Sequence, residues 1–221
     1  MTVSPENLIV CSTAGKVYAL NKTDGSQIWK SELSGIHEGV GSLFMFGDKV
    51  YVGMNGCLVA LNLVNGKEVW RNSLSGMRYN EISLLVTPIF VEATSFGTQS
   101  VVVVASHGKV YGLGSETGDI LWKNGLRNGG YDLPTVMLDS SAVLVGCGKQ
   151  LYRIDIRNGK TIWQKKISKC LLGCSHVTMA THQGSLQAAF TQTAFCNNPI
   201  AQYAIKEKEE KKHAAIGAFA M

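Results

Sequence analysis

Two cysteines and two histidines near the carboxyl end of the chain have side chains that could bind a metal. Cys170 and Cys174 are followed by His176, and His182 lies six residues further on. Thiolate and imidazole are the ligands that zinc prefers. The spacing is loose, and successive residues of a strand point to opposite faces, so these side chains would diverge. We therefore interpret them as buried thiols and surface imidazoles and predict no metal site.

Other residues with possible chemistry lack the context that the chemistry needs. The glycines at 112, 114 and 118 are spaced like a nucleotide-binding loop, but strand composition follows them where such a loop opens a helix. No acidic partner recurs beside the histidines, and no serine–histidine–aspartate arrangement has a sequence context. We predict no catalytic residue and no cofactor. The five histidines are His37, His107, His176, His182 and His213.

Composition excludes several classes of protein. Of the 221 residues, 45% are hydrophobic and 17% are charged, a balance that argues against intrinsic disorder. No apolar run is long enough for a transmembrane helix. The net charge of +5 comes from cations scattered singly along the chain, unlike the clustered cations of a nucleic-acid surface. No basic segment followed by an apolar one opens the chain, so we predict no signal peptide and a cytoplasmic location.

The cysteines agree with that location. Most of them lie in apolar, strand-like stretches, and they do not form the dense framework of a disulfide-rich domain. We therefore predict reduced, buried thiols. The six are Cys11, Cys57, Cys147, Cys170, Cys174 and Cys196.

A repeat around the tryptophans determines the fold class. Each tryptophan comes four residues after a glycine, nine residues after an aliphatic residue and four residues before another. Agreement in register of this kind indicates repeated structural units. The tryptophans are Trp29, Trp70, Trp122 and Trp163, and the glycines are Gly25, Gly66, Gly118 and Gly159.

Each unit has the pattern of a β-hairpin. In the first unit, Val17 to Leu20 has strand composition, the stretch from Lys22 to Ser26 is rich in turn residues, and strand composition resumes at Gln27. The glycine can adopt the positive φ that a tight turn requires. Further strand-like segments precede the hairpin, for example residues 42–46 and 49–53. We therefore expect each unit to form a four-stranded antiparallel sheet.

The tryptophans are 41, 52 and 41 residues apart, which is the spacing of propeller blades. We predict an all-β fold, a single small β-propeller over residues 1–221 with clear repeats at 6–33, 41–74, 81–126 and 133–167. The longer third unit places an insertion between Pro88 and Val101. Each tryptophan is expected to cover the neighbouring blade and to donate its indole N–H to a backbone carbonyl.

We expect five blades. Tyr203–Ile205 matches the third strand of the first unit, so residues 174–221 are assigned to a degenerate fifth blade. The first unit lacks an innermost strand, which the apolar residues 214–221 could supply to close the ring. Four blades with a tail, or a partial propeller, are the alternatives. An incomplete ring could pair edge to edge, so we expect a monomer or an edge-paired homodimer.

The units resemble the tryptophan-docking repeat of the pyrroloquinoline-quinone (PQQ) propeller family, whose pattern is Ala-x-Asp-x-x-Thr-Gly-Lys-x-x-Trp. The resemblance covers residues 6–167, with Gly112, Gly114 and Arg153 as departures at the Ala and Asp places. The matching positions are Ala19, Asn21, Gly25 and Trp29, then Ala60, Asn62, Gly66, Lys67 and Trp70, then Thr117, Gly118 and Trp122, and finally Asp155, Gly159, Lys160 and Trp163.

What the resemblance implies for function is limited, because the same blade serves dehydrogenases, assembly factors and non-catalytic domains. The family's dehydrogenases use seven or eight blades, a metal site, a catalytic aspartate and, commonly, a disulfide between adjacent cysteines. This chain is shorter and has no adjacent cysteine pair. We therefore expect a protein that is not an enzyme.

The links between blades are the candidate ligand-binding segments. Three of them recur four residues after the tryptophans and are rich in polar and aromatic side chains. Such groups suit sugar binding and protein interfaces equally. The candidates are His37, Glu38, Arg78, Tyr79, Asn80, Arg127, Asn128, Tyr131 and Asp132.

Two kinds of partner follow from these links. The first hypothesis is a protein-interaction scaffold, and the alternative is a multivalent lectin with several equal pockets. A remnant of a PQQ-dependent dehydrogenase is a third reading. The expected partner is thus a protein or a glycan, with no nucleic acid and no membrane span.

Overall fold

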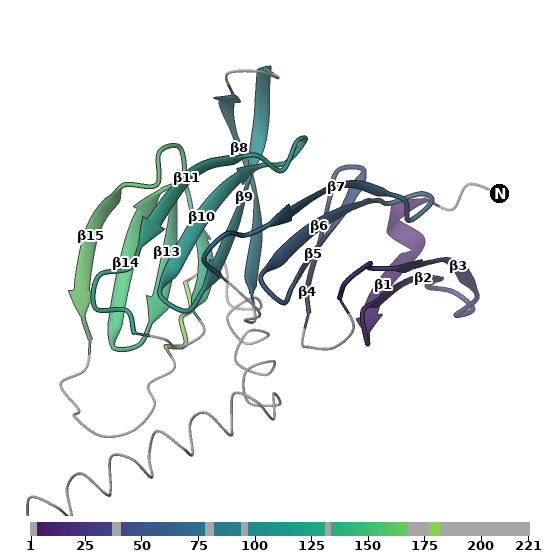
Figure 1. The fold of residues 1–221 in the computed structure, drawn as a ribbon, viewed down its shortest axis with the longest axis horizontal. Helices are drawn as coiled ribbons and strands as arrows, with labels where there is room; N and C mark the ends of the chain where they lie inside the picture. The colour runs from purple at the N-terminus through teal and green to yellow at the C-terminus, as the bar shows by residue number, and fades with distance from the viewer. Residues whose placement is uncertain are drawn as a thin grey trace, which may run out of the picture.

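The computed structural model of the chain describes residues 4–36, 41–77, 82–93, 97–130, 134–167 and 177–181. The described residues form antiparallel sheets in which strands follow one another in chain order, and each sheet is one blade (Figure 1). Blade 1 contains β1 (Leu8–Thr13), β2 (Lys16–Asn21) and β3 (Gln27–Glu32); blade 2 contains β4 (Ser42–Phe46), β5 (Lys49–Met54), β6 (Cys57–Asn62) and β7 (Glu68–Ser73). Blade 3 contains β8 (Ser83–Ala93), β9 (Gly97–Ser106), β10 (Lys109–Gly114) and β11 (Ile120–Gly125); blade 4 contains β12 (Thr135–Asp139), β13 (Ala142–Cys147), β14 (Gln150–Asp155) and β15 (Thr161–Lys166).

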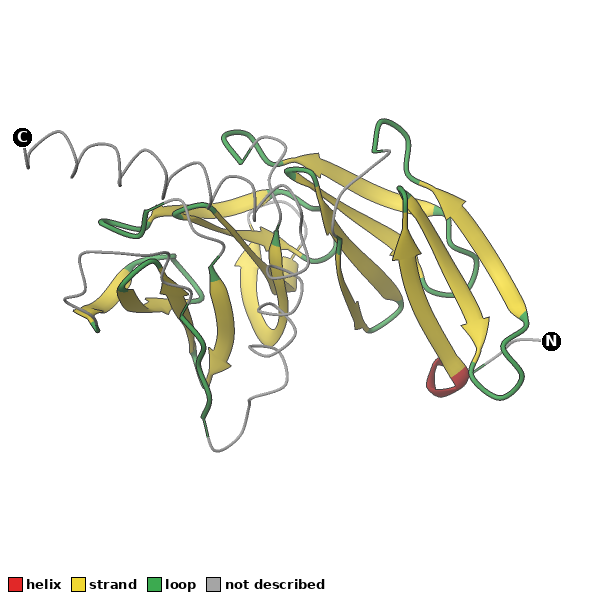
Figure 2. Cartoon of the chain, turned by 90° about the horizontal axis from the view of Figure 1, so that it is seen from below, coloured by secondary structure: helices red, strands yellow, loops and turns green. Residues whose placement is uncertain are grey.

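Blade 1 has one strand fewer than the others among the described residues. Its β1 pairs with β2 as β5 pairs with β6, so the missing neighbour is the counterpart of β4. A short 3₁₀ helix, η1 (Pro5–Asn7), precedes β1 and is red in Figure 2. The predicted absence of an innermost strand from the first unit is therefore confirmed within residues 4–36.

The hairpin turns follow the repeat. In blades 1, 2 and 4 a side-chain oxygen of Asn21, Asn62 or Asp155 accepts a hydrogen bond from the backbone N–H two residues later, at 2.8–3.0 Å. The repeat glycine then adopts a φ of +69° to +73° in all four blades. A side chain at that φ would be strained, which explains why the position is glycine.

Each of the first three tryptophans joins its blade to the next. The indole N–H of Trp29 donates to the Leu63 carbonyl at 2.9 Å, that of Trp70 to Ser115 at 2.9 Å, and that of Trp122 to Ile156 at 2.6 Å. A Cβ on the next blade's repeat glycine would lie only 2.3–2.5 Å from the ring. The predicted docking role is thus confirmed for these three residues.

The hydrophobic core lies between the blades. Three clusters of buried side chains fill the interfaces of blades 1 and 2, 2 and 3, and 3 and 4. Because a middle blade is covered on both faces, every residue of β5 is buried. Blade faces that are covered on both sides require near-continuous apolar strands, such as Val101–Ala105 in blade 3.

The insertion in the third unit lengthens one hairpin. Strands β8 and β9 have 11 and 10 residues, and their register shifts between Val86 and Phe90. The hairpin extends beyond the neighbouring strands in Figure 1. The sequence placed the insertion between Pro88 and Val101, and the extension of the hairpin by β8 and β9 agrees with that position.

One residue from the lengthened hairpin replaces a missing turn side chain. Gly114 occupies the position of Asn21 and Asn62, so it has no oxygen to cap the turn. The buried side chain of Gln99 lies against Gly114, and its Oε1 accepts a hydrogen bond from the Glu116 N–H at 2.9 Å. Gln99 therefore makes, from a different strand, the contact that the other blades make from the repeat itself.

The two outermost blade faces of the described array lack a covering neighbour. The side chain of Trp163 is 40% exposed, whereas Trp29, Trp70 and Trp122 are 7–9% exposed. At the other end, Gly25 has no atom within 4 Å of its Cβ position. Cys11, predicted to be buried, is exposed on β1, on the face that no blade of the described array covers. That prediction was wrong for Cys11, while Cys57 and Cys147 are buried.

The predicted fifth blade lies outside the described residues except for 177–181. Val177 packs against Gly146, and the Thr135 hydroxyl donates to its carbonyl. Ile82, which precedes β8, packs in the same way on Gly53 and accepts from Ser42. Val177 therefore occupies, against blade 4, the position that Ile82 occupies against blade 2. The five-blade count and the closing role of residues 214–221 stay predictions.

Candidate functional site

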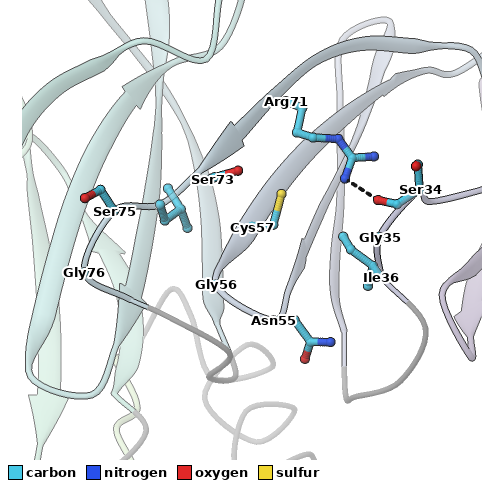
Figure 3. Close-up of a pocket in the computed structure, with 11 residues that line it drawn as sticks. Ser34, Gly35, Ile36, Asn55, Gly56, Cys57, Arg71, Ser73, Ser75 and Gly76 are labelled. Atoms are coloured by element: carbon cyan, nitrogen blue, oxygen red, sulfur yellow. Dashed lines mark hydrogen bonds between the residues drawn. The ribbon is translucent and has the colours of Figure 1, made fainter.

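A cleft of about 580 Å³ lies between the first two interblade links (Figure 3). The residues after Leu33 and after Leu74 form its two sides, and the β5–β6 turn and the start of β6 form its floor. The lining residues are Ser34, Gly35, Ile36, Asn55, Gly56, Cys57, Arg71, Ser73, Leu74, Ser75 and Gly76.

The links begin with the same backbone turn, and this turn shapes the cleft. The N–H of Ile36 donates to the Leu33 carbonyl at 3.1 Å, that of Met77 to Leu74 at 2.9 Å, and that of Gly129 to Leu126 at 3.0 Å. Ile36 and Met77 are buried, so the first and second links are anchored by an apolar residue. The polar residues before them remain at the surface.

Tyrosine hydroxyls hold the second and third links, and an arginine holds the first. The hydroxyl of Tyr111 donates to Ser75 at 2.9 Å, and that of Tyr152 donates to Arg127 at 2.6 Å. The counterpart of both tyrosines in blade 2 is Val59, which cannot reach a link. The guanidinium of Arg71 holds the first link instead, by donating to the Ser34 carbonyl at 2.9 Å.

The floor of the cleft is open because a cysteine stands where longer side chains occur in the other blades. Cys57 is the counterpart of Lys109, whose ammonium reaches the Gly76 carbonyl at 2.5 Å. In blade 4 the counterpart is Gln150, which accepts a hydrogen bond from Gln164 at 3.1 Å. The short thiol leaves space below the first link that these side chains occupy elsewhere.

Arg71 is the charged group of the cleft. It forms a two-pronged ion pair with Glu68, at 3.0 Å from Nε and 2.7 Å from Nη2. The hydrogen bond to Glu68 raises the pKa of the guanidinium. Figure 3 shows the guanidinium directed toward Ser34, with Cys57 and Ser73 nearby. Arg71 is therefore a fixed cation at the cleft wall.

The thiol of Cys57 is not poised for nucleophilic chemistry. Burial raises its pKa, and the neighbouring Arg71 charge offsets only part of that effect. A thiol with a raised pKa is protonated at neutral pH and reacts slowly. The lining residues contain no carboxylate and no histidine, and the nearby Glu68 charge adds to the rise in the thiol pKa.

The structure describes only two of the predicted link residues. Arg127 and Asn128 are exposed on the third link, and Asn128 has a φ of +61°. The other seven lie outside the described residues: His37, Glu38, Arg78, Tyr79, Asn80, Tyr131 and Asp132. Their role as a ligand site stays a prediction.

The cleft includes residues that the sequence reasoning did not select. Arg71 directly follows a repeat tryptophan, and Cys57 replaces a long side chain at a repeat position. Aligning the four units and comparing side-chain size at each position could have identified both. The β5–β6 turn residue Asn55 carries no such signal.

The described residues contain no group of three histidine, cysteine or acidic side chains that could hold a metal ion. The cleft offers no carboxylate to act as a catalytic aspartate.

No helix in the described part of the chain is long and apolar enough to cross a membrane.

Comparison with known families agrees with the repeat and the blades. A family model described as outer membrane protein assembly factor BamB matches residues 13–170 and, in a second match, residues 86–198. The chain belongs to this family of BamB-like PQQ repeats. No curated protein matches the chain significantly in sequence.

Solved structures with the same fold include an assembly factor, enzymes and a designed protein. BamB from Moraxella catarrhalis shares 21% identity over 72% of this chain and 49% of its own, with a TM-score of 0.51. A quinohemoprotein alcohol dehydrogenase from Pseudomonas putida HK5 shares 15% over 72% and 32%, with a TM-score of 0.58. The computationally designed Ika8 protein shares 16% over 72% and 46%, with a TM-score of 0.55.

These matches establish the blade architecture, and the recognition of the family from the repeat is confirmed. At identities of 15–21% they show the fold alone. The matched part of the chain spans about half of BamB and about a third of the dehydrogenase. Since both an assembly factor and a dehydrogenase match, the fold alone does not decide between binding and catalysis.

Proposed function

We propose that this BamB-like propeller is a non-catalytic module that binds a partner protein through its interblade links. The observation that carries the proposal is the cleft between the first two links. Its lining combines three serine hydroxyls and the Arg71 guanidinium with the apolar side chains of Ile36 and Leu74. Protein interfaces combine a polar rim and an apolar centre in the same way.

The lining chemistry favours a partner segment rich in hydrogen-bond acceptors. The serine hydroxyls and the remaining N–H groups of Arg71 can donate, while the two-pronged pair with Glu68 balances the Arg71 charge. A loop or chain end that carries a carboxylate fits these donors. The net charge of +5 would also favour encounter with an acidic partner.

The lectin alternative is less well supported. A multivalent lectin needs pockets of similar chemistry, and the position below each link carries Cys57, Lys109 or Gln150 in successive blades. The lysine and the glutamine already make hydrogen bonds of their own. Blades with such different side chains would not present equal sugar sites. The PQQ-dependent remnant lacks a supporting group in the described cleft, and the cytoplasmic location stays a prediction.

The test fills the cleft with the side chain that the next blade has at the equivalent position. Cys57→Lys introduces at the cleft floor the side chain that blade 3 carries at the same repeat position. Val64→Lys is the matched control, because it adds the same charge to an exposed turn of blade 2 away from the cleft. Affinity capture with quantitative mass spectrometry would compare wild-type protein with both variants.

We expect a set of captured proteins that Val64→Lys retains and Cys57→Lys loses. The same samples go onto a glycan array, together with Tyr79→Ala/Tyr131→Ala. Saturable glycan binding that the double tyrosine variant loses would support a lectin and contradict the proposal. Identical capture by the wild type and Cys57→Lys would show that the cleft is not the binding site.

A further inference from the structure

The three interblade contacts share one set of interactions. The tryptophan ring lies on the repeat glycine of the next blade, and its N–H donates to the carbonyl three residues before that glycine. The side chain two residues after the tryptophan donates to the carbonyl of the glycine itself. These donors are Ser31, Asn72 and Asn124, the latter two at 2.7 Å.

The two ends of the array carry the two halves of a fourth such contact. On blade 4, Trp163 and Ile167 are 40% and 52% exposed, although their counterparts in the other blades are 2–9% exposed. On blade 1, Gly25 has a φ of +73° with nothing within 4 Å of its Cβ position, and Ile9 is 49% exposed. Each face presents apolar groups that this repeat buries everywhere else.

We infer that blade 4 of one chain docks on blade 1 of a second copy, with Trp163 on Gly25. By the rule of the three internal contacts, the Trp163 N–H donates to the Lys22 carbonyl and Lys165 donates to the Gly25 carbonyl. Arg153, which lies beside Trp163 in the sheet, is paired with Asp139 at 3.0 Å, so its charge is balanced. Two such contacts close a ring of two chains.

Repeat register argues for a second copy over the chain's own last residues. Aligning Tyr203–Ile205 with Tyr18–Leu20 puts Glu210 at the position of the repeat glycine. A Cβ there would approach the tryptophan ring to 2.3–2.5 Å in each internal contact. Among the residues with this register, Gly25 is the glycine that no tryptophan covers in the described structure.

The missing strand of blade 1 supports the same arrangement. Val177 brings the chain past blade 4 to the point where the innermost strand of a following blade begins. Among the described residues, blade 1 is the blade without an innermost strand.

The test is the mass of the chain in solution, measured by light scattering after gel filtration. We expect the wild type to have twice the chain mass of 23.9 kDa and Trp163→Ala to have the single mass. Gly25→Ala should also shift the protein to the single mass. Gly47→Ala is its control, since Gly47 has a φ of +62° and equally open space but lies in a turn outside both end faces.

Several results would overturn the inference. One is a wild-type mass of 23.9 kDa at every concentration. In that case a fluorescence component that is protected from quenching and that Trp163→Ala removes would indicate that the chain's own residues cover the ring. A dimer that Trp163→Ala and Gly25→Ala leave intact would indicate another interface. The Cys57→Lys variant should remain dimeric, so failure of the cleft proposal and failure of this one are distinguishable.

Discussion

At the scale of single residues, the tryptophans differ in how much of the side chain is exposed and in which groups it contacts. Trp70 is 9% exposed, lies 5.9 Å from the Tyr51 ring centre and donates to a buried carbonyl of blade 3. Trp163 has the same place in the repeat but is 40% exposed. The same residue type therefore contributes very differently to the stability of one chain.

Trp70→Ala should lower the free energy of unfolding by about 3–5 kcal/mol, because it creates a cavity between blades and leaves the Ser115 carbonyl with only the hydroxyl of Tyr51. Trp163→Ala should cost roughly 1 kcal/mol in the single chain, since much of that ring is already in water. Urea denaturation measured at low protein concentration compares the two. Equal losses would contradict the end-blade description.

Buried tyrosines should make the fold sensitive to alkali. Tyr51 is 1% exposed, and burial raises its pKa from 10.0 to about 12. Burial also raises the pKa of Tyr152 to about 12. Because the pKa of each tyrosine is higher in the folded protein, its contribution to stability is complete below pH 10. That contribution is lost as the pH rises toward 12.

We therefore expect the free energy of unfolding to fall between about pH 10 and pH 12, by on the order of 1–2 kcal/mol for Tyr51 alone. Tyr51→Phe should reduce the slope over that range. Denaturation curves at several alkaline pH values, with absorbance at the phenolate band, follow both quantities. A slope that Tyr51→Phe leaves unchanged would assign the effect to other groups.

At the scale of elements, the lengthened hairpin of blade 3 compensates for a departure from the repeat. Gln99 caps the Glu116 N–H because Gly114 has no side chain. Gly114 in turn has to be glycine, since a Cβ there would lie 2.3 Å from the Gln99 Oε1. The two residues depend on each other although they lie on different strands.

Gln99→Ala should cost about 1–3 kcal/mol, because the Glu116 N–H loses its acceptor. In the double variant Gln99→Ala/Gly114→Asn, the new amide can cap the turn as Asn62 does in blade 2, so part of the loss should return. Thermal or urea unfolding of the four proteins forms a double-mutant cycle. Additive losses would contradict the coupling.

The elements were largely readable from the sequence, and the cleft was not. Strands and turns follow the repeat because each unit has to bury the same faces. The residue type at Gly66 or Trp70 therefore predicts its position in the blade. The cleft exists because Cys57 and Val59 have shorter side chains than Lys109 and Tyr111, which occupy the same repeat positions in blade 3. Such space arises only when blades are stacked, so a single unit carries no trace of it. The exposure of Cys11 likewise depends on which blades are stacked, and the sequence of one unit does not show this.

At the scale of the whole molecule, the described residues cover blades 2 and 3 on both sides and blades 1 and 4 on one side. In repeat architectures each unit is stabilised mainly by its neighbours. The end blades should therefore open first, at lower free energy than the middle ones.

Hydrogen exchange of the Trp163→Ala variant should show this order. We expect peptides from β1 and β15 to exchange at least tenfold faster than peptides from β5 and β10, a difference of about 1.4 kcal/mol or more in opening free energy. In the wild type, docking of a second copy should slow exchange at both ends together. Uniform protection along the variant chain would argue that the described array is not open.

The Gln99 contact also bears on which blades can serve as interchangeable parts. Blades 2 and 4 carry their turn caps within their own hairpins, in Asn62 and Asp155. A grafting experiment could move either hairpin into another PQQ propeller without further change. The β10–β11 hairpin cannot be moved alone in this way, because the side chain that caps its turn, Gln99, belongs to β9. Anyone recombining blades from this chain would have to transplant β8–β11 as one piece.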